Sequence, residues 1–324
     1  MATARTDFSI RQLEPRDLDQ WLELGNQVTA YPSDRASFLF NETLRAPSEP
    51  ALRLSAWNPA GAFAGMADAT LGDEGEVLTN RARASVAVVS PFRRLGLGER
   101  LIHDVERFAR EANVRWIEGE VLEANLPFTA PFLTRLGYHE LERYQLSVQN
   151  PATVNLSGLE ALRERLQQEG IETTAFPPID SEASRQSLYR CTLAIWRDMP
   201  HEPHVDWRDP PFGVFERNQF DRPAALADSL FVARDGDEIV GLTYFLRRPN
   251  GDAEVGDTGV LRSHRRRGIG RVLKMMASRY AVEHGINQVY TDNRADNAGM
   301  LAINRELGFS PGEQLVIFEK TLAR

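Results

Sequence analysis

The residues best placed to do chemistry lie near the end of the chain, where a strand, a glycine turn and a helix follow one another. An apolar strand ends at Val260, and residues 265–270 read RRRGIG before a long amphipathic pattern begins. The first N–H groups of a helix lack intrahelical partners and the helix dipole is positive there, so such a turn favours an anion. Gly268 and Gly270 let the backbone approach that anion without a Cβ in the way. The spacing therefore predicts a phosphate site made of main-chain N–H groups.

The turn matches neither the dinucleotide-binding motif, which needs G-x-G-x-x-G, nor the P-loop, which needs G-K-[ST]. The turn instead resembles the signature [QR]-x-x-G-x-[GA] of the GNAT superfamily of acyl-CoA-dependent N-acetyltransferases, which Arg265, Gly268 and Gly270 fill. A second motif of that family follows at the expected distance. It consists of Asn297, an apolar helix, and the LGF of residues 307–309.

The resemblance implies that acetyl-CoA is the co-substrate and that the turn binds its pyrophosphate. Main-chain N–H groups would hold the phosphates, and guanidinium groups would add positive charge beside them. Asn297 is also implied as a contact of CoA. Because Asn is a common helix cap, capping is the structural alternative for Asn297. The implied binding residues are Val260, Arg265, Arg266, Arg267, Gly268, Ile269, Gly270, Arg271 and Asn297.

Acetyl transfer to an amine needs a held thioester, a base for the amine proton and a stabilised thiolate. Some members of the family place a Glu eleven residues before the first motif residue, which here is Glu254 in the strand AEVGDTGV. Period-two alternation puts Glu254, Gly256 and Thr258 on one face of that strand and Asp257 on the other. Glu254 is therefore our candidate base, and a solvent-facing strand Glu is the alternative.

The family's usual general acid, a tyrosine four residues before the glycine of LGF, is absent from this sequence. Asn304 holds that position in the second half of the chain, and Leu133 holds it in the first half. An Asn side chain can donate a hydrogen bond to sulfur, so Asn304 is our second catalytic candidate. The alternatives are another acid, water, or a thiolate that leaves unprotonated.

The turn and the LGF motif each occur twice. Gly96 and Gly98 recur as Gly268 and Gly270 at an offset of 172, and the LGY of residues 136–138 recurs as LGF at an offset of 171. Two landmarks separated by nearly the same distance indicate a tandem duplication of one domain. We expect an N-terminal domain over residues 1–150 and a C-terminal domain over residues 151–324, with a joining helix at residues 156–170.

The first half keeps the turn but lacks the candidate catalytic residues. Ala82 stands where Glu254 stands in the second half. Counted back from the glycine of LGY, Asn125 is one residue out of register, and Pro127 and Pro131 interrupt the helix pattern. We therefore expect the second domain to catalyse and the first to be mainly structural, with a vestigial CoA site. The residues of that site are Arg93, Arg94, Gly96 and Gly98.

Both halves have the pattern of an α/β fold of the α+β type. β-Branched strands such as residues 83–89, amphipathic helices such as residues 182–198, and hairpin turns such as Asp235-Gly236 alternate along the chain. Together with the resemblance, the pattern predicts two tandem GNAT folds. Each would be a mixed, mostly antiparallel splayed sheet flanked by helices.

Composition excludes several classes of function. The chain has 324 residues, of which 42% are hydrophobic and 26% charged, with a net charge of −8. Such an acidic balance argues against a nucleic-acid binder, and no run reaches the apolar length of a membrane span. The N-terminal residues lack the apolar region of a signal peptide, so we expect a cytoplasmic protein.

Cysteine and histidine usage gives no sign of a metal. The single cysteine, Cys191, excludes a disulfide within the chain and a cysteine metal cluster. His201 and His204 have a metal-like spacing, but no further ligands are close in sequence, so we expect no metal. The stretch around them, with Asp206, Trp207 and Arg208, falls where the family's substrate loops vary, and it is a weak candidate for reading an acceptor.

The leading hypothesis is an N-acetyltransferase that moves an acetyl group from acetyl-CoA to a primary amine of a small molecule, as a monomer or homodimer. Mycothiol synthase, which acetylates a cysteinyl pseudodisaccharide, has the same two-domain layout and a similar length. Its motif usually carries the tyrosine that is missing here, which counts against it. A third hypothesis is a non-catalytic acyl-CoA sensor, which the missing tyrosines favour. Thiol release with a panel of amines separates the three.

Overall fold

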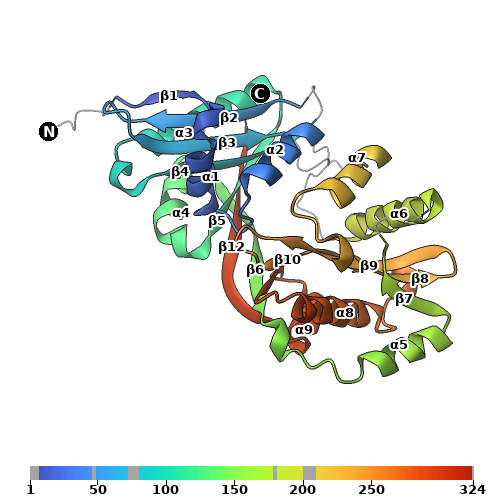
Figure 1. Cartoon of the computed structure of the whole chain (residues 1–324). Coiled ribbons are helices and arrows are strands. Elements are labelled where there is room, and N and C mark those ends of the chain that lie inside the picture. Colours follow the sequence, from blue (N-terminus) through green and yellow to red (C-terminus); the bar gives the residue numbers. More distant parts are fainter. Residues whose placement is uncertain (1–6, 46–48, 72–79, 178–180, 200–208, 323–324) are drawn as a thin grey trace. The chain divides into compact units, whose positions relative to one another are not determined.

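A computed structural model describes residues 7–45, 49–71, 80–177, 181–199 and 209–322 (Figure 1). Contacts divide the chain into two compact units. The first unit is built from the described residues within 1–143, 202–210 and 314–324, and the second from those within 144–201 and 211–313.

The first unit is a helix-flanked sheet with the strand order β1-β2-β3-β4-β5-β12. Its strands pair antiparallel, except β4 and β5, which run parallel. In chain order the elements are β1 (Ser9–Gln12), α1 (Leu18–Asn26), α2 (Arg35–Leu44), β2 (Ala51–Trp57), β3 (Phe63–Thr70), β4 (Arg81–Val88), α3 (Leu97–Glu111), β5 (Trp116–Leu122), α4 (Leu126–Arg135) and β12 (Ser310–Thr321).

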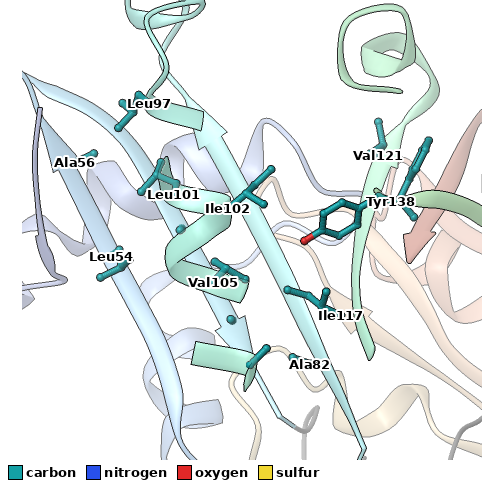
Figure 2. Packing of buried hydrophobic residues seen from close by; sticks show 14 of the residues in the cluster. Leu54, Ala56, Ala82, Leu97, Leu101, Ile102, Val105, Ile117, Val121 and Tyr138 are labelled. Carbon is teal, nitrogen blue, oxygen red and sulfur yellow. The ribbon is translucent and has the colours of Figure 1, made fainter. Parts of the chain in front are cut away.

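The core of the first unit lies between α3 and the sheet. Leu97, Leu101 and Val105 recur every four residues, so they form one apolar stripe on α3. Figure 2 shows this stripe facing side chains of the strands, with Ile117 of β5 among them. The helix α1 covers the opposite face of the sheet, where Trp21 belongs to a second buried cluster.

The second unit repeats this plan with the strand order β6-β11-β10-β9-β8-β7. Its helices α6 and α8 pack on opposite faces of the sheet, as Figure 1 shows on either side of β9. In chain order the elements are β6 (His139–Gln149), α5 (Leu159–Gln168), β7 (Ile171–Ala175), α6 (Glu182–Asp198), α7 (Phe212–Glu216), β8 (Phe231–Asp235), β9 (Glu238–Arg247), β10 (Ala253–Val260), α8 (Ile269–Glu283), β11 (Val289–Arg294) and α9 (Ala298–Glu306).

In both units the parallel strand pair opens soon after it starts. β4 pairs with β5 only from Arg81↔Trp116 to Arg83↔Glu118, and β10 pairs with β11 only at Ala253↔Val289 and Glu254↔Tyr290. Beyond those residues the strands separate, so their main-chain groups are not used by the partner strand. This opening confirms the predicted fold class of mixed, splayed sheets.

The last strand of each half of the sequence completes the sheet of the unit formed by the other half. β12 pairs with β5 from Leu315↔Leu122 to Thr321↔Trp116, and residues 144–149 of β6 pair with β11. Lys320 on β12 also donates to the buried Glu106 of α3 at 2.6 Å. The expected split at residue 150 did not include this exchange, and the sequence pattern predicted neither strand.

Two helices bear on expectations from the sequence. The segment expected to join the domains packs inside the second unit as α5, where Leu159 and Leu166 are buried beside α8. The predicted interruption at Pro127 and Pro131 is wrong, because α4 runs unbroken through both. A proline in the first turn removes no intrahelical hydrogen bond, so only Pro131 removes one.

Candidate active site

The turn that opens α8 has a backbone suited to an anion. Arg266 has a φ of +64° and Gly268 a φ of +87°, so two residues of the turn are left-handed. Left-handed residues in such a turn aim successive N–H groups into one concavity, which is how backbone nests bind phosphate. Arg265 fixes the turn to the strand before it, because its Nε donates to the carbonyl oxygen of Val260 at 2.9 Å.

The first unit builds the same turn from the same kinds of residue. Arg94 has a φ of +66° and Gly96 a φ of +84°. Arg93 Nε donates to the carbonyl oxygen of Val88 at 2.9 Å. A left-handed arginine is strained in each unit, and such strain is typical of functional turns. The two units therefore build this turn with the same backbone conformation.

Acidic residues hold most of the turn's guanidinium groups in the second unit. Arg265 pairs with Asp198 of α6 at 2.8 Å, and Arg267 pairs with Glu169 at 3.0 Å. Arg266 is exposed. The paired arginines are oriented before any ligand arrives, which lowers the ordering cost of binding a phosphate.

Space beside the second turn glycine differs between the units. A Cβ added at Gly270 would lie 3.6 Å from Val260 Cγ2. A Cβ at Gly98 would lie 3.7 Å from Val88 Cγ2 and 3.8 Å from the ring of Phe132. Phe132 belongs to α4, so a side chain of α4 lies beside the turn in the first unit.

Asn297 lies at the start of α9, where its Oδ1 accepts from the main-chain N of Met300 at 3.2 Å. It is therefore a helix cap, as the structural alternative required. Its Nδ2 group is what a ligand would use, and contact with CoA stays a prediction. Asn125 has the same place at the start of α4, although counting from the glycine of LGY put it out of register.

β10 carries a β-bulge, and Asp257 lies in it. Pairing with β9 shifts by one residue between Val255 and Thr258. The Oδ2 atom of Asp257 accepts from Trp196 Nε1 and from the hydroxyl of Tyr244, both at 3.0 Å. Burial raises the pKa of the Asp257 carboxyl, and these two donors act against that rise. A carboxyl with a raised pKa is suited to accept a proton from an amine.

The bulge also changes which side chains share a face. Asp257 bonds to α6, and a Cβ at Gly259 would meet α6 as well, whereas Val255 packs in the core beneath α8. Alternation from these positions puts Glu254 on the α6 face and Thr258 on the α8 face. The expected grouping of Glu254 with Thr258, opposite Asp257, is therefore wrong, because two residues of β10 oppose one of β9 at the bulge.

Glu254 is held by an arginine at the closed end of the strand pair. Its Oε2 lies 3.1 Å from Arg248 Nη1, and both side chains are largely buried. Arg248 in turn lies over the ring of Tyr290, 4.3 Å from its centre. This partner competes with a substrate amine for the carboxylate, which makes Glu254 a weaker base candidate than Asp257.

Asn304 is buried in a chain of polar side chains. Its Oδ1 accepts from Lys274 Nζ at 2.8 Å, and its Nδ2 donates to Asn293 Oδ1 at 2.6 Å. Sequence reasoning did not single out Lys274. The available signal was one charged residue in an otherwise apolar stretch of helix, VLKMMA. A catalytic role for Asn304 stays a prediction.

Other expected features lie away from the site or fall on residues that the structure does not describe. His201, His204, Asp206, Trp207 and Arg208 fall outside the described residues. Among the residues that are described, no group of three His, Cys, Asp or Glu side chains is placed to hold a metal ion. Within that same part of the chain, no helix combines the length and the apolar character that crossing a membrane requires.

The acetyltransferase (GNAT) family profile matches twice, at residues 16–138 and 187–309. This chain belongs to the acetyltransferase (GNAT) family. The starts and the ends of the two matches each lie 171 residues apart, so the two matches support a tandem GNAT protein and the duplication read from the glycines.

Relatives of this GNAT protein include two mycothiol acetyltransferases. The enzyme of Corynebacterium efficiens is 30% identical over 116 residues, which is 34% of this chain and 39% of that enzyme. The enzyme of Corynebacterium glutamicum is 32% identical over 94 residues, which is 29% of this chain and 32% of that enzyme. The matched stretch thus spans well under half the length of either relative.

Solved structures agree with the fold over the whole chain. A tandem GNAT protein from the clavulanic acid biosynthesis pathway has a TM-score of 0.75 at 18% identity, covering 98% of this chain and 99% of that one. A GCN5-related N-acetyltransferase from Sphaerobacter thermophilus has a TM-score of 0.69 at 17% identity, covering 97% and 95%. At these identities the likeness confirms two tandem GNAT folds.

Proposed function

We propose that this GNAT protein transfers the acetyl group of acetyl-CoA to a primary amine of a small molecule, and that the second unit is the catalytic one. The observation that carries the proposal is the position of Asp257 in the β10 bulge. It lies beyond the last β10–β11 pair, beside the opening of the sheet. The anion turn is attached to the end of the same strand, about 10 Å further along at 3.3 Å per residue.

Each candidate residue then has a role. The turn from Arg265 to Arg271 holds the pyrophosphate through its main-chain N–H groups, and Val260 offers main-chain groups to the rest of the cofactor. Acetyl-CoA supplies the activated acetyl group when bound. Asp257 accepts the amine proton, and Tyr244 and Trp196 orient its carboxylate. Glu254 is the alternative base.

A second candidate acceptor comes from the relatives. Both Corynebacterium proteins are mycothiol acetyltransferases, so the cysteinyl pseudodisaccharide acceptor of mycothiol synthesis is a specific form of the same proposal. It is one member of the acceptor panel below, and the general proposal does not depend on it.

The test is free-thiol release from acetyl-CoA by the purified protein with a panel of primary amines that includes the mycothiol precursor. We expect release with at least one amine, and a product heavier by one acetyl group in mass spectrometry. Binding of acetyl-CoA without release for every amine would instead support an acyl-CoA sensor. Asp257→Asn serves as the catalytic control, because it keeps the shape of the side chain but cannot accept the proton.

A further inference from the structure

A buried lysine lies behind the splay of the second unit. Lys274, on the face of α8 that packs on the sheet, is 5% exposed. Its Nζ donates to the neutral amide of Asn304 at 2.8 Å and lies 5.2 Å from the ring centre of Phe309. Lysines are almost never fully buried without a charged partner, because an ammonium loses its hydration there. Such a position calls for a reason beyond packing.

Polar contacts lead from this lysine to the wall of the splay. Asn304 Nδ2 donates to Asn293 Oδ1 at 2.6 Å. Asn293 is half-buried on β11, beyond Tyr290, the last residue that pairs with β10. The chain Lys274–Asn304–Asn293 therefore extends from beneath α8 to the part of β11 that has separated from β10.

The first unit fills the same three positions with apolar side chains. α3 and α8 have the same length, and Lys274 corresponds to Ile102. Asn304 corresponds to Leu133, four residues before the glycine of LGY. Val289 and Ile117 are equivalent buried residues of β11 and β5, so Asn293 corresponds to Val121.

Figure 2 shows Ile102 on α3 and Val121 on β5 within one apolar cluster, and Leu133 packs against it. The same fold is thus built without any charge at these positions. Packing alone therefore does not explain Lys274, because an apolar side chain would fill the same space without the cost of desolvating an ammonium.

The charge of this lysine changes in an accessible pH range. Burial lowers the pKa of Lys274 to about 8, and the carboxylate of Asp292 on β11 acts the other way. Two groups that face Nζ, Asn304 of α9 and Phe309 just before β12, carry no charge. Lys274 is therefore a cation at neutral pH and becomes neutral above about pH 8.

We propose that Lys274 is a positioning residue that stabilises the departing CoA thiolate through Asn304. The inference rests on the proposed function. As the C–N bond forms, the C–S bond breaks with its electron pair going to sulfur, and the amine proton goes to Asp257. Lys274 keeps its proton. An amide has two N–H donors, so Asn304 can give one to Asn293 and the other to the sulfur, while the ammonium polarises it.

The first experiment transplants the apolar set of the first unit. The variant Lys274→Ile/Asn304→Leu/Asn293→Val should fold with unchanged or higher thermal stability and bind CoA within about threefold of wild type. Its kcat should fall by at least roughly tenfold, since one oxyanion donor contributes that much or more in other enzymes. Full turnover by the folded variant would overturn the proposal. The single variant Lys274→Met repeats the test with only the ammonium removed.

The second experiment does not need an acceptor amine, so it judges this inference even if the proposed function fails. The pH of a solution of the CoA-bound protein is raised stepwise, and the ultraviolet absorbance of the CoA thiolate is recorded at each step. A nearby cation lowers a thiol pKa, so below about pH 8, where Lys274 is still charged, the bound thiol should be more ionised in wild type than in Lys274→Met. Equal titration curves for the two proteins would overturn the role of Lys274. If wild type nevertheless acetylates an amine, the acetyltransferase proposal still stands.

The third experiment compares the pH dependence of kcat in wild type and in Lys274→Met. Wild-type kcat should fall above about pH 8, where Lys274 loses its charge, and Lys274→Met should lack that alkaline limb. A merely structural lysine would change the level of activity and leave the shape of the profile unchanged. The same limb in both proteins would therefore contradict the proposal.

Discussion

The two units of this GNAT protein share a turn and differ in what lies behind it. Arg94 and Gly96 in one, and Arg266 and Gly268 in the other, have nearly equal left-handed φ angles. The strand before the turn is regular in the first unit and bulged in the second. Anion binding needs only backbone geometry, which many sequences can keep, whereas chemistry needs placed side chains. Comparing the units therefore separates what the fold requires from what a reaction requires.

The largest difference between the units should appear in a matched pair of glycine variants, Gly270→Asp and Gly98→Asp. Each glycine is the second residue of its helix and has no left-handed φ, so an aspartate fits there. The helix dipole stabilises its negative charge. In the second unit its charge would repel the pyrophosphate. We expect Gly270→Asp to lower turnover at least about a thousandfold, roughly 4 kcal/mol.

The partner variant, Gly98→Asp, should leave most of the turnover intact. Circular dichroism of both variants checks the fold, and calorimetry with CoA checks which site binds. Loss of activity in folded Gly98→Asp would show that the first unit takes part in catalysis.

Two carboxylates of β10 give the next largest contrast. Asp257→Asn should lower kcat/KM by roughly a hundredfold, the usual scale for losing a general base. Glu254→Gln should have an effect of only a few fold, because Glu254 already pairs with Arg248. Steady-state kinetics at saturating acetyl-CoA measures both. The reverse order would restore Glu254 as the base and leave Asp257 as a structural residue of the bulge.

The buried lysine should also appear in stability as a function of pH. The pKa of Lys274 is lowered from 10.5 to about 8 by burial, so between these values the unfolded chain binds more protons than the folded one. Stability should therefore rise with pH across that window, and the rise should be absent in Lys274→Met. From pH 8 to pH 10 the unfolding free energy of wild type should rise by about 2 kcal/mol relative to that of Lys274→Met. Denaturant unfolding at several pH values measures it, and parallel curves would contradict a charged buried lysine.

Much of this architecture could be predicted from local patterns. The helix Glu182–Asp198 begins and ends where the sequence placed it, and the repeated glycines located both turns. β6 and β12 were missed because a strand's partner depends on contacts between distant residues rather than on its own pattern. Their exchange between the two units had no signal in the chain order.

The site was harder to predict than the fold for a related reason. A bulge adds one residue to one strand, so period-two alternation assigns the wrong face beyond it, and Asp257 was set aside on that ground. Lys274 reads as an ordinary surface charge until the packing around α8 is known. Rules based on periodicity fail where a residue departs from its neighbours, and functional residues tend to be those that depart.

The smallest expected effect concerns the hydroxyl that orients Asp257. In Tyr244→Phe the carboxylate loses one of its two donors, and that donor lowers the pKa of Asp257 against the rise caused by burial. Its removal should raise the pKa further, so the acid limb of the kcat/KM profile should move to higher pH by about half a unit. On that acid limb kcat/KM should be lower than in wild type, since more of the base is protonated. An unchanged acid limb in a folded variant would mean that Asp257 is not the group that titrates, and the comparison of the two units would then have to place the base elsewhere.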